Sequence, residues 1–153
     1  MRSIENTLAL WMSGLLSSEE VATWAAREII RRDQPPMELF DLVSDGPEKC
    51  MKRAEFDFPP RPSQLTYLQA FAVRAVVLDL ASDESLSEFA NWAARSCMGE
   101  DLDNPVVQLG YQLDHLLDDC QDPEGAKSLV RAELPSLLSY CRSVAAPYVE
   151  TEA

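Results

Sequence analysis

The chain has 153 residues, of which 46% are hydrophobic, and its 26 acidic and 13 basic residues give a net charge of −13. This hydrophobic content argues against disorder, and the length suits one domain with a substantial core. The acidic excess opposes binding to nucleic-acid phosphates and to anionic membranes, so we expect neither as a partner.

Helix signals occur along the whole chain, and the first third predicts four helices. Ser3 is placed to cap a helix over about 4–13 that ends at Gly14. Ser17 and Glu20 have the spacing of a capping box for a helix over about 18–33. The prolines at 35–36 end that helix and begin a third, "PMELFDLVS", and a short fourth helix follows Gly46.

The segment "FDFPPRPS", residues 56–63, contains three prolines and is the predicted linker of the chain. Phe56 and Phe58 are expected to hold this segment against the core. The linker divides a single all-α domain, residues 1–153, into a first helical unit over 1–55 and a second over 64–146.

The second part of the chain predicts four more helices. Ser63 is expected to cap a long helix over about 64–82, and Ser85 with Glu88 forms a second capping-box pattern for a helix that ends near 98. Helices also start at the Asn-Pro pair 104–105 and the Asp-Pro pair 122–123, and Pro135 is expected to break the last one. No stretch shows the alternation of a strand, so we predict an all-α fold of about eight helices.

One string occurs twice. "SSEEVATWAAR" at 17–27 and "SLSEFANWAAR" at 85–95 are identical at seven of eleven positions. This similarity predicts an internal duplication of a three- to four-helix unit, packed as a helical array or as a pseudo-two-fold bundle.

The residues that are identical in the two copies are predicted to have structural roles. Trp24 and Trp92 lie at the edge of a wide apolar arc, so each helix should have neighbours on more than one side, and each indole N–H needs an acceptor. Arg27 and Arg95 follow three residues after each tryptophan and are expected to lie over its ring. We interpret these four residues as a structural repeat rather than as a binding site.

The segment from 100 to 124 has the strongest charge bias. It contains eight acidic residues and no Lys or Arg. Acidic residues near helix starts complement the helix dipole, which accounts for Asp101, Asp103, Asp122 and Glu124 but not for Asp114, Asp118 and Asp119. We therefore predict a partner-binding acidic face made of Asp101, Asp103, Asp114, Asp118, Asp119 and Asp122.

"YQLDHLLDDC" at 111–120 is the stretch with residues of catalytic type. Asp114–Asp118 and His115–Asp119 are pairs spaced by four, so Asp114, His115 and Asp118 give an alternative hypothesis of a metal-binding or hydrolytic enzyme. Nucleophilic catalysis with His115 requires a Ser or Cys brought near by folding. Leu113, Leu116, Leu117 and Cys120 are expected to form the core stripe. Because no known catalytic motif is present, we expect no enzyme, metal or cofactor.

The four cysteines, at 50, 97, 120 and 141, include no CxxC pair. Cys97 takes the place of Ile29 in the repeat, which favours a buried reduced thiol. The first residues lack the pattern of a secretory signal, and the longest apolar stretch is too short to span a bilayer. These features predict a cytoplasmic protein without disulfides.

The stretch "GLLSSEEVATWAAREIIRRDQPPMELFDLV" resembles the opening of small, uncharacterised bacterial proteins of the toxin-immunity kind. The matching residues are Ser17, Glu19, Glu20, Trp24, Ala25, Asp33, Pro35, Pro36, Glu38, Leu39 and Leu42. The resemblance covers about 30 residues and implies a helical cytosolic protein that neutralises a toxin by binding it.

The resemblance and the charge together give one leading hypothesis. It is a non-enzymatic binding protein, monomeric or homodimeric, whose acidic face occludes a basic toxin or nuclease. A structural or homodimeric helical scaffold is the other alternative.

Overall fold

The structure is a computed structural model that describes residues 2–150. Within this range the chain forms eight α-helices, one π-helix and one 3₁₀-helix, and no strand. The all-α prediction is therefore confirmed. The residues divide into two compact units: unit 1 contains residues 2–65 and 147–150, and unit 2 contains residues 66–146.

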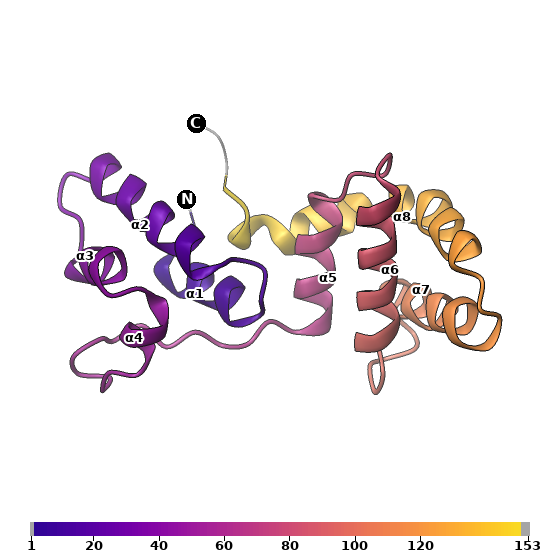
Figure 1. Ribbon diagram of the computed structural model, residues 1–153, viewed down its shortest axis with the longest axis horizontal. Helices are drawn as coiled ribbons and strands as arrows, with labels where there is room; N and C mark the ends of the chain where they lie inside the picture. Colours follow the sequence, from indigo (N-terminus) through magenta and orange to yellow (C-terminus); the bar gives the residue numbers. More distant parts are fainter. Residues whose placement is uncertain (1, 151–153) are drawn as a thin grey trace. The chain divides into compact units, whose positions relative to one another are not determined.

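Unit 1 is built around one central helix. The second helix contacts the three others, as the wide apolar arc around Trp24 predicts. In chain order the helices are α1 (Ile4–Met12), α2 (Ser18–Arg31), α3 (Met37–Ser44) and α4 (Pro47–Met51) (Figure 1).

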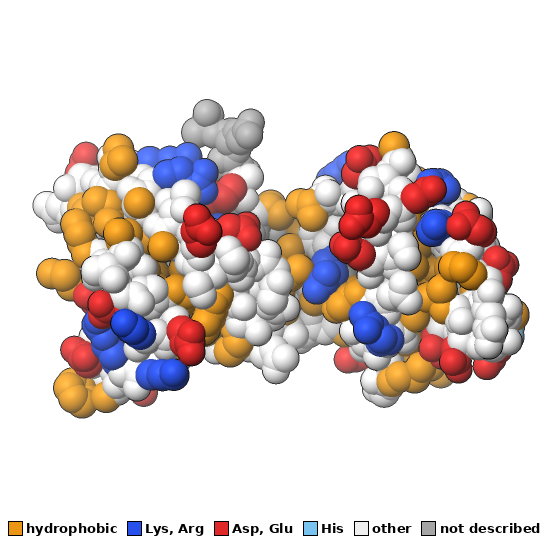
Figure 2. Space-filling model, viewed as in Figure 1, with side chains coloured by type: hydrophobic (Ala, Val, Ile, Leu, Met, Phe, Trp, Pro, Cys, Tyr) orange, Lys and Arg blue, Asp and Glu red, His pale blue; other side chains and the backbone are white. Residues whose placement is uncertain are grey.

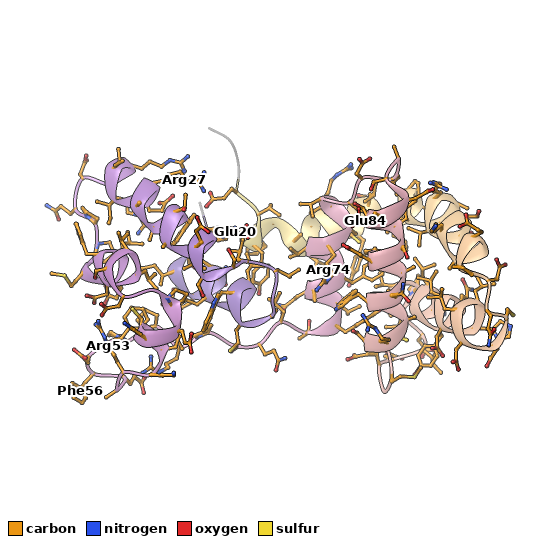
Figure 3. The ribbon with its side chains drawn as sticks, viewed as in Figure 1. Glu20, Arg27, Arg53, Phe56, Arg74 and Glu84 are labelled. Carbon is orange, nitrogen blue, oxygen red and sulfur yellow. The ribbon has the colours of Figure 1, made fainter. Side chains whose placement is uncertain are left out.

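Trp24 is the largest side chain in the core of unit 1 and is only 1% exposed. The cation over its ring is Arg2, whose guanidinium carbon lies 5.6 Å from the ring centroid. The prediction that Arg27 covers this ring is wrong. Arg27 lies exposed on α2 (Figure 3), and the cation over the ring comes instead from Arg2, which precedes α1. The indole Nε1 finds no acceptor among the described residues.

Two irregular segments complete unit 1. Phe58 is fully buried in its core, whereas Phe56, expected to be buried beside it, is 92% exposed. Arg61 holds the 56–63 segment in place by donating hydrogen bonds to the carbonyls of Arg53, Phe58 and Pro60. The returning residues 147–150 are bound through backbone carbonyls that accept hydrogen bonds from Arg2 and Asn6.

Unit 2 is a bundle of four α-helices in which each helix contacts the other three. A π-helix, η1 (His115–Asp119), follows the third of these helices directly. The 3₁₀-helix η2 (Ala146–Tyr148) follows the last one and leads into residues 147–150, which belong to unit 1. The four helices are α5 (Tyr67–Val76), α6 (Asp83–Ser96), α7 (Pro105–Asp114) and α8 (Pro123–Ala145).

Most predicted helix starts are confirmed. Ser3, Asn104 and Asp122 cap α1, α7 and α8 with their side chains, and Ser17 with Glu20 forms the complete capping box of α2. Gly46 precedes α4, at whose first position Pro47 lies.

Two predicted starts are wrong. Helix α5 is capped by Thr66, with Gln69 completing the capping box, and not by Ser63. Helix α6 is capped by Ser82, so Ser85 is the third helical residue and donates its backbone N–H to the Ser82 hydroxyl. In both places a second capping residue lies three positions further along, and local pattern alone does not choose between them.

Pro135 does not break α8, which continues through it to Ala145. A proline inside a helix costs roughly 3 kcal/mol because it removes one backbone hydrogen bond and crowds the preceding turn. Here the ring is exposed, and Val130, Leu134 and Cys141 on both sides of it are fully buried. This apolar contact, largely with α5, offsets the local cost.

The two copies of the repeated string occupy different positions in their helices. Helices α2 and α6 both have 14 residues, but Ser17 precedes α2 whereas Ser85 lies inside α6. Trp24 is buried, whereas Trp92 is half-buried and stacks on Tyr67 at 5.4 Å. The internal duplication stays a prediction.

No helix of residues 2–150 has the length and apolar character needed to cross a membrane.

The closest backbone approach in unit 2 involves Gly110 of α7. A Cβ atom built on Gly110 would lie 2.6 Å from the Tyr67 hydroxyl, 2.8 Å from Cys97 Cβ and 3.2 Å from the Ala93 carbonyl oxygen. Ala93 of α6 and Cys97, the C-terminal cap of that helix, are fully buried. Glycine is therefore required where α6 and α7 meet.

We expect Gly110→Ala to destabilise the protein. At an exposed helix position this change stabilises by about 1 kcal/mol, but here the added methyl group must displace α6, and overpacking of this kind costs about 1–3 kcal/mol. Urea unfolding followed by circular dichroism measures the change. Gln112→Ala, an exposed position on the same helix, should stay within about 0.5 kcal/mol of the wild type. A stabilised G110A variant would contradict the close approach.

Candidate functional site

The acidic segment 100–124 extends over four consecutive parts of unit 2: the α6–α7 loop, α7, η1 and the first turn of α8. Seven of its eight acidic side chains are exposed, and Asp114 is half-buried. Figure 2 shows several acidic side chains gathered on unit 2 over the region of α7 and α8. The segment thus keeps its charge at the surface.

Four of the eight carboxylates take part in local structure. Asp101 accepts a hydrogen bond from the backbone N–H of Asp103, and Asp122 accepts one from Gly125 at the start of α8. Glu124 pairs with Lys127 at 3.0 Å. Asp119 contacts His115. Of the predicted binding residues, Asp101, Asp119 and Asp122 therefore already have a structural role.

The other four carboxylates make no hydrogen bond or ion pair with any described residue. They are Glu100, Asp103, Asp114 and Asp118. Unit 2 as a whole has 13 acidic and five basic residues, which gives a formal charge of −8. Two of the five bases, Lys127 and Arg131, are already paired with carboxylates of the unit. Asp103, Asp114 and Asp118 are thus the part of the predicted face that is free to meet a cation.

The turn after α7 is wider than an α-helical turn. In η1 the backbone N–H of Cys120 donates to the carbonyl of His115, five residues earlier. Gln121 then takes a positive φ of 47°, and the N–H of Asp122 donates to the carbonyl of Leu116. Positive φ is uncommon for a residue other than glycine, and such backbone is frequent at functional sites.

The wide turn brings three reactive side chains together. His115 Nδ1 lies 2.8 Å from Asp119 Oδ2, which confirms the predicted pairing of these two residues. His115 Nε2 lies 3.6 Å from Cys120 Sγ. The expectation that Cys120 belongs to the core stripe is wrong, because its side chain is exposed.

The spacing of a regular α-helix over residues 111–120 does not predict the position of Cys120. In an α-helix, residues five apart lie roughly 140° apart around the axis. In a π turn the backbone hydrogen bond joins residues five apart, so Cys120 lies on the same side as His115. Sequence periodicity does not show a single wide turn.

An open groove of about 600 Å³ lies beside this cluster. Leu116 and Leu129 provide apolar contact area in the groove, and Glu133 provides a carboxylate from α8. The lining residues are Tyr111, Gln112, His115, Leu116, Leu129 and Glu133. The groove is mainly apolar, with polar groups that include one acid.

The alternative site of Asp114, His115 and Asp118 does not form as a cluster. Within the described chain no three His, Cys, Asp or Glu residues are arranged to hold a metal ion. Instead, His115 directs both ring nitrogens to Asp119 and Cys120. Asp114, His115 and Asp118 are thus not brought together around a common metal or catalytic site.

The second tryptophan of the repeat lines a different hollow, of about 470 Å³, between α5 and α6. Arg74 of α5 (Figure 3) lies 4.6 Å from the Trp92 ring centroid. Burial lowers the pKa of Arg74. Arg95, which was expected to cover Trp92, donates instead to the carbonyl of Asn91 on its own helix. Glu88, one turn before Trp92, also lines this hollow, so its wall carries charges of both signs.

Exposed apolar side chains also lie outside the acidic segment. Met37, Phe40 and Val43 recur at intervals of three on α3 and are 69%, 44% and 44% exposed. The scaffold or homodimer hypothesis stays a prediction.

Comparison of the chain with protein-family models, with curated proteins and with solved structures finds no match in any of the three.

The four cysteines are free thiols with different access to solvent. Cys50, Cys97 and Cys141 are fully buried, whereas Cys120 is exposed. Burial raises the pKa of Cys50 and Cys97, and it raises that of Cys141 to about 11. Because the thiolate is the reactive form, the three buried thiols should be inert in the folded protein.

We expect one thiol per folded chain to react rapidly with an uncharged reagent such as iodoacetamide. The other three should react only at the rate of unfolding. Mass spectrometry of the labelled, digested protein should place the fast modification on Cys120, and Cys120→Ser should remove it. Rapid labelling of Cys50, Cys97 or Cys141 would contradict the burial described above.

Proposed function

We propose that this chain is a non-enzymatic binding protein that recognises a basic protein partner through the acidic surface of unit 2. The observation that carries the proposal is the charge of the segment 100–124, which contains eight acidic residues and no Lys or Arg. Seven of these eight acidic side chains are exposed. Asp103, Asp114 and Asp118 are its main binding residues, because the described residues leave their carboxylates without partners.

Electrostatics explains why such a surface favours a cationic partner. Carboxylates held near one another without counter-charges repel, and a positive surface relieves this repulsion when it binds. Complementary charge also speeds the encounter of two proteins. The same charge disfavours nucleic acids and anionic membranes.

The groove beside η1 gives the proposed surface a place for one side chain of the partner. Lys and Arg combine an apolar stem with a charged end. Leu116 and Leu129 would contact the stem, the Tyr111 ring offers a cation–π partner, and Glu133 offers a carboxylate. An arginine of the partner that enters the groove would then contact apolar area and charge together.

The resemblance of residues 14–43 to toxin-immunity proteins supports a more specific proposal. A toxin that cleaves nucleic acid needs cationic groups to hold phosphates. Carboxylates such as Asp114 and Asp118 would pair with those groups and block access to them. We propose a cytoplasmic location for this inhibition and a basic toxin or nuclease as the partner.

The test compares two variants of equal charge in the cells that naturally express the chain. The first is Asp103→Asn/Asp114→Asn/Asp118→Asn. The control is Glu19→Gln/Glu55→Gln/Asp57→Asn, which removes three exposed acids from unit 1. We expect the wild type and the control to retain the same Lys/Arg-rich protein in affinity purification, and the first variant to lose it.

Affinities measured with the purified partner should show that the binding is electrostatic in origin. The first variant should lose at least roughly tenfold in affinity, which corresponds to about 1.4 kcal/mol. Wild-type affinity should fall as salt rises from 50 to 500 mM, because salt screens exposed charges. Equal loss in both triple variants, or an affinity that does not depend on salt, would contradict the proposed surface.

A further inference from the structure

His115, Asp119 and Cys120 have the arrangement of a base, a positioning carboxylate and a nucleophile. We propose that Cys120 is a nucleophilic thiol, deprotonated by His115 and supported by Asp119, that forms mixed disulfides with cationic disulfide-bearing molecules. This inference does not rest on the proposed binding function, because the reaction needs no protein partner.

The contact with Asp119 decides which ring nitrogen accepts the thiol proton. A carboxylate only accepts hydrogen bonds, so His115 donates Nδ1–H to Asp119 Oδ2 across 2.8 Å. The lone pair of Nε2 then faces Cys120 Sγ at 3.6 Å and accepts the hydrogen bond that the thiol donates. Asp119 is a positioning residue, because it acts on the thiol only through the imidazole.

A reactive thiol must also be accessible to solvent and must have space beside it for the reacting molecule, and Cys120 has both. Cys120 is exposed, in contrast to the three other cysteines. His115 also lines the 600 Å³ groove, so a molecule held between Tyr111 and Leu129 lies beside the base. The nucleophile, its base and a place for the reacting molecule therefore occur together in one part of unit 2.

The surrounding charge selects the reacting molecule. Asp114, Asp118 and Asp122 lie within six residues of Cys120 in the chain, and Glu133 lines the groove. From α8, Glu124 also contributes negative charge, although Lys127 pairs with it. This field repels anionic disulfides such as oxidised glutathione and concentrates cationic ones.

The proposed step conserves atoms and electrons. The thiol proton moves to His115 Nε2, and Cys120 Sγ attacks one sulfur of the disulfide R–S–S–R. A new Sγ–S bond forms as the old S–S bond breaks, and the leaving thiolate takes the proton from His115. The products are the mixed disulfide of Cys120 and one free thiol R–SH, so no oxidant other than the disulfide is required.

The experiment measures second-order rate constants of the full chain with cystamine, a dication, and with oxidised glutathione. An ordinary exposed cysteine is only about 3% ionised at pH 7. We expect the wild type to react with cystamine at least roughly tenfold faster than with oxidised glutathione at low salt. Mass spectrometry should place the mixed disulfide on Cys120.

Two variants test the roles of the neighbours. His115→Gln should lower the cystamine rate at pH 7 by roughly fivefold or more, and the rate should then fall about tenfold per pH unit below pH 8, as for a simple thiol. Asp119→Asn and Asp118→Asn remove the same charge, but only Asp119 contacts His115. We therefore expect D118N to lower the cystamine rate only through its lost charge and to keep the shape of the wild-type pH profile, whereas D119N should lower the rate and change that shape.

The side chains of His115 and Asp119 are 64% and 66% exposed, so these variants should keep the fold, which circular dichroism verifies. Wild-type rate and pH profile in H115Q would overturn the assignment of the base. Identical profiles in D119N and D118N would overturn the role of Asp119, and a glutathione rate equal to that of cystamine would overturn the charge selection.

Discussion

The contact between α6 and α7 at Gly110 is the constraint on which the candidate site depends. The two helices approach so closely that a Cβ atom at Gly110 would overlap Tyr67 and Cys97. In a close-packed interior an added side chain at this point would displace its neighbours, so the approach leaves little freedom in the position of α7. Helix α7 is therefore fixed against the core of unit 2, and η1, which continues from it, begins from a fixed position.

The acidic segment combines unpaired carboxylates with a π turn that places a histidine beside a cysteine. Four of its carboxylates are used for local structure, and four are free among the described residues. The same turn places His115 between Asp119 and Cys120 and beside the groove. A negative surface and a nucleophile thus lie in one part of unit 2. The two proposals share a preference for cationic molecules, although each can fail without the other.

The helix pattern could be predicted from the sequence wherever one capping residue was available. Ser3, Ser17 and Asn104 act as caps as expected. The pattern failed where two candidates lay three residues apart, as for Ser82 and Ser85, because either start satisfies the local rules. It failed at Pro135 because burial of the neighbouring apolar residues outweighs the local preference of proline.

The sequence by itself determined the all-α class, most helix starts and the acidic character of residues 100–124, because these depend on residue type and on spacing along one helix. Only the tertiary structure decided which arginine covers each tryptophan: Arg2 and Arg74 come from other segments of the chain. The tertiary structure also decided that Cys120 contacts His115, because the π turn of η1 changes which residues lie on the same side of the helix. The contact between His115 and Cys120 depends on a place where the backbone departs from regular α-helical geometry, and the contacts of the two arginines depend on how separate segments pack. The spacing of residues along the sequence predicts neither.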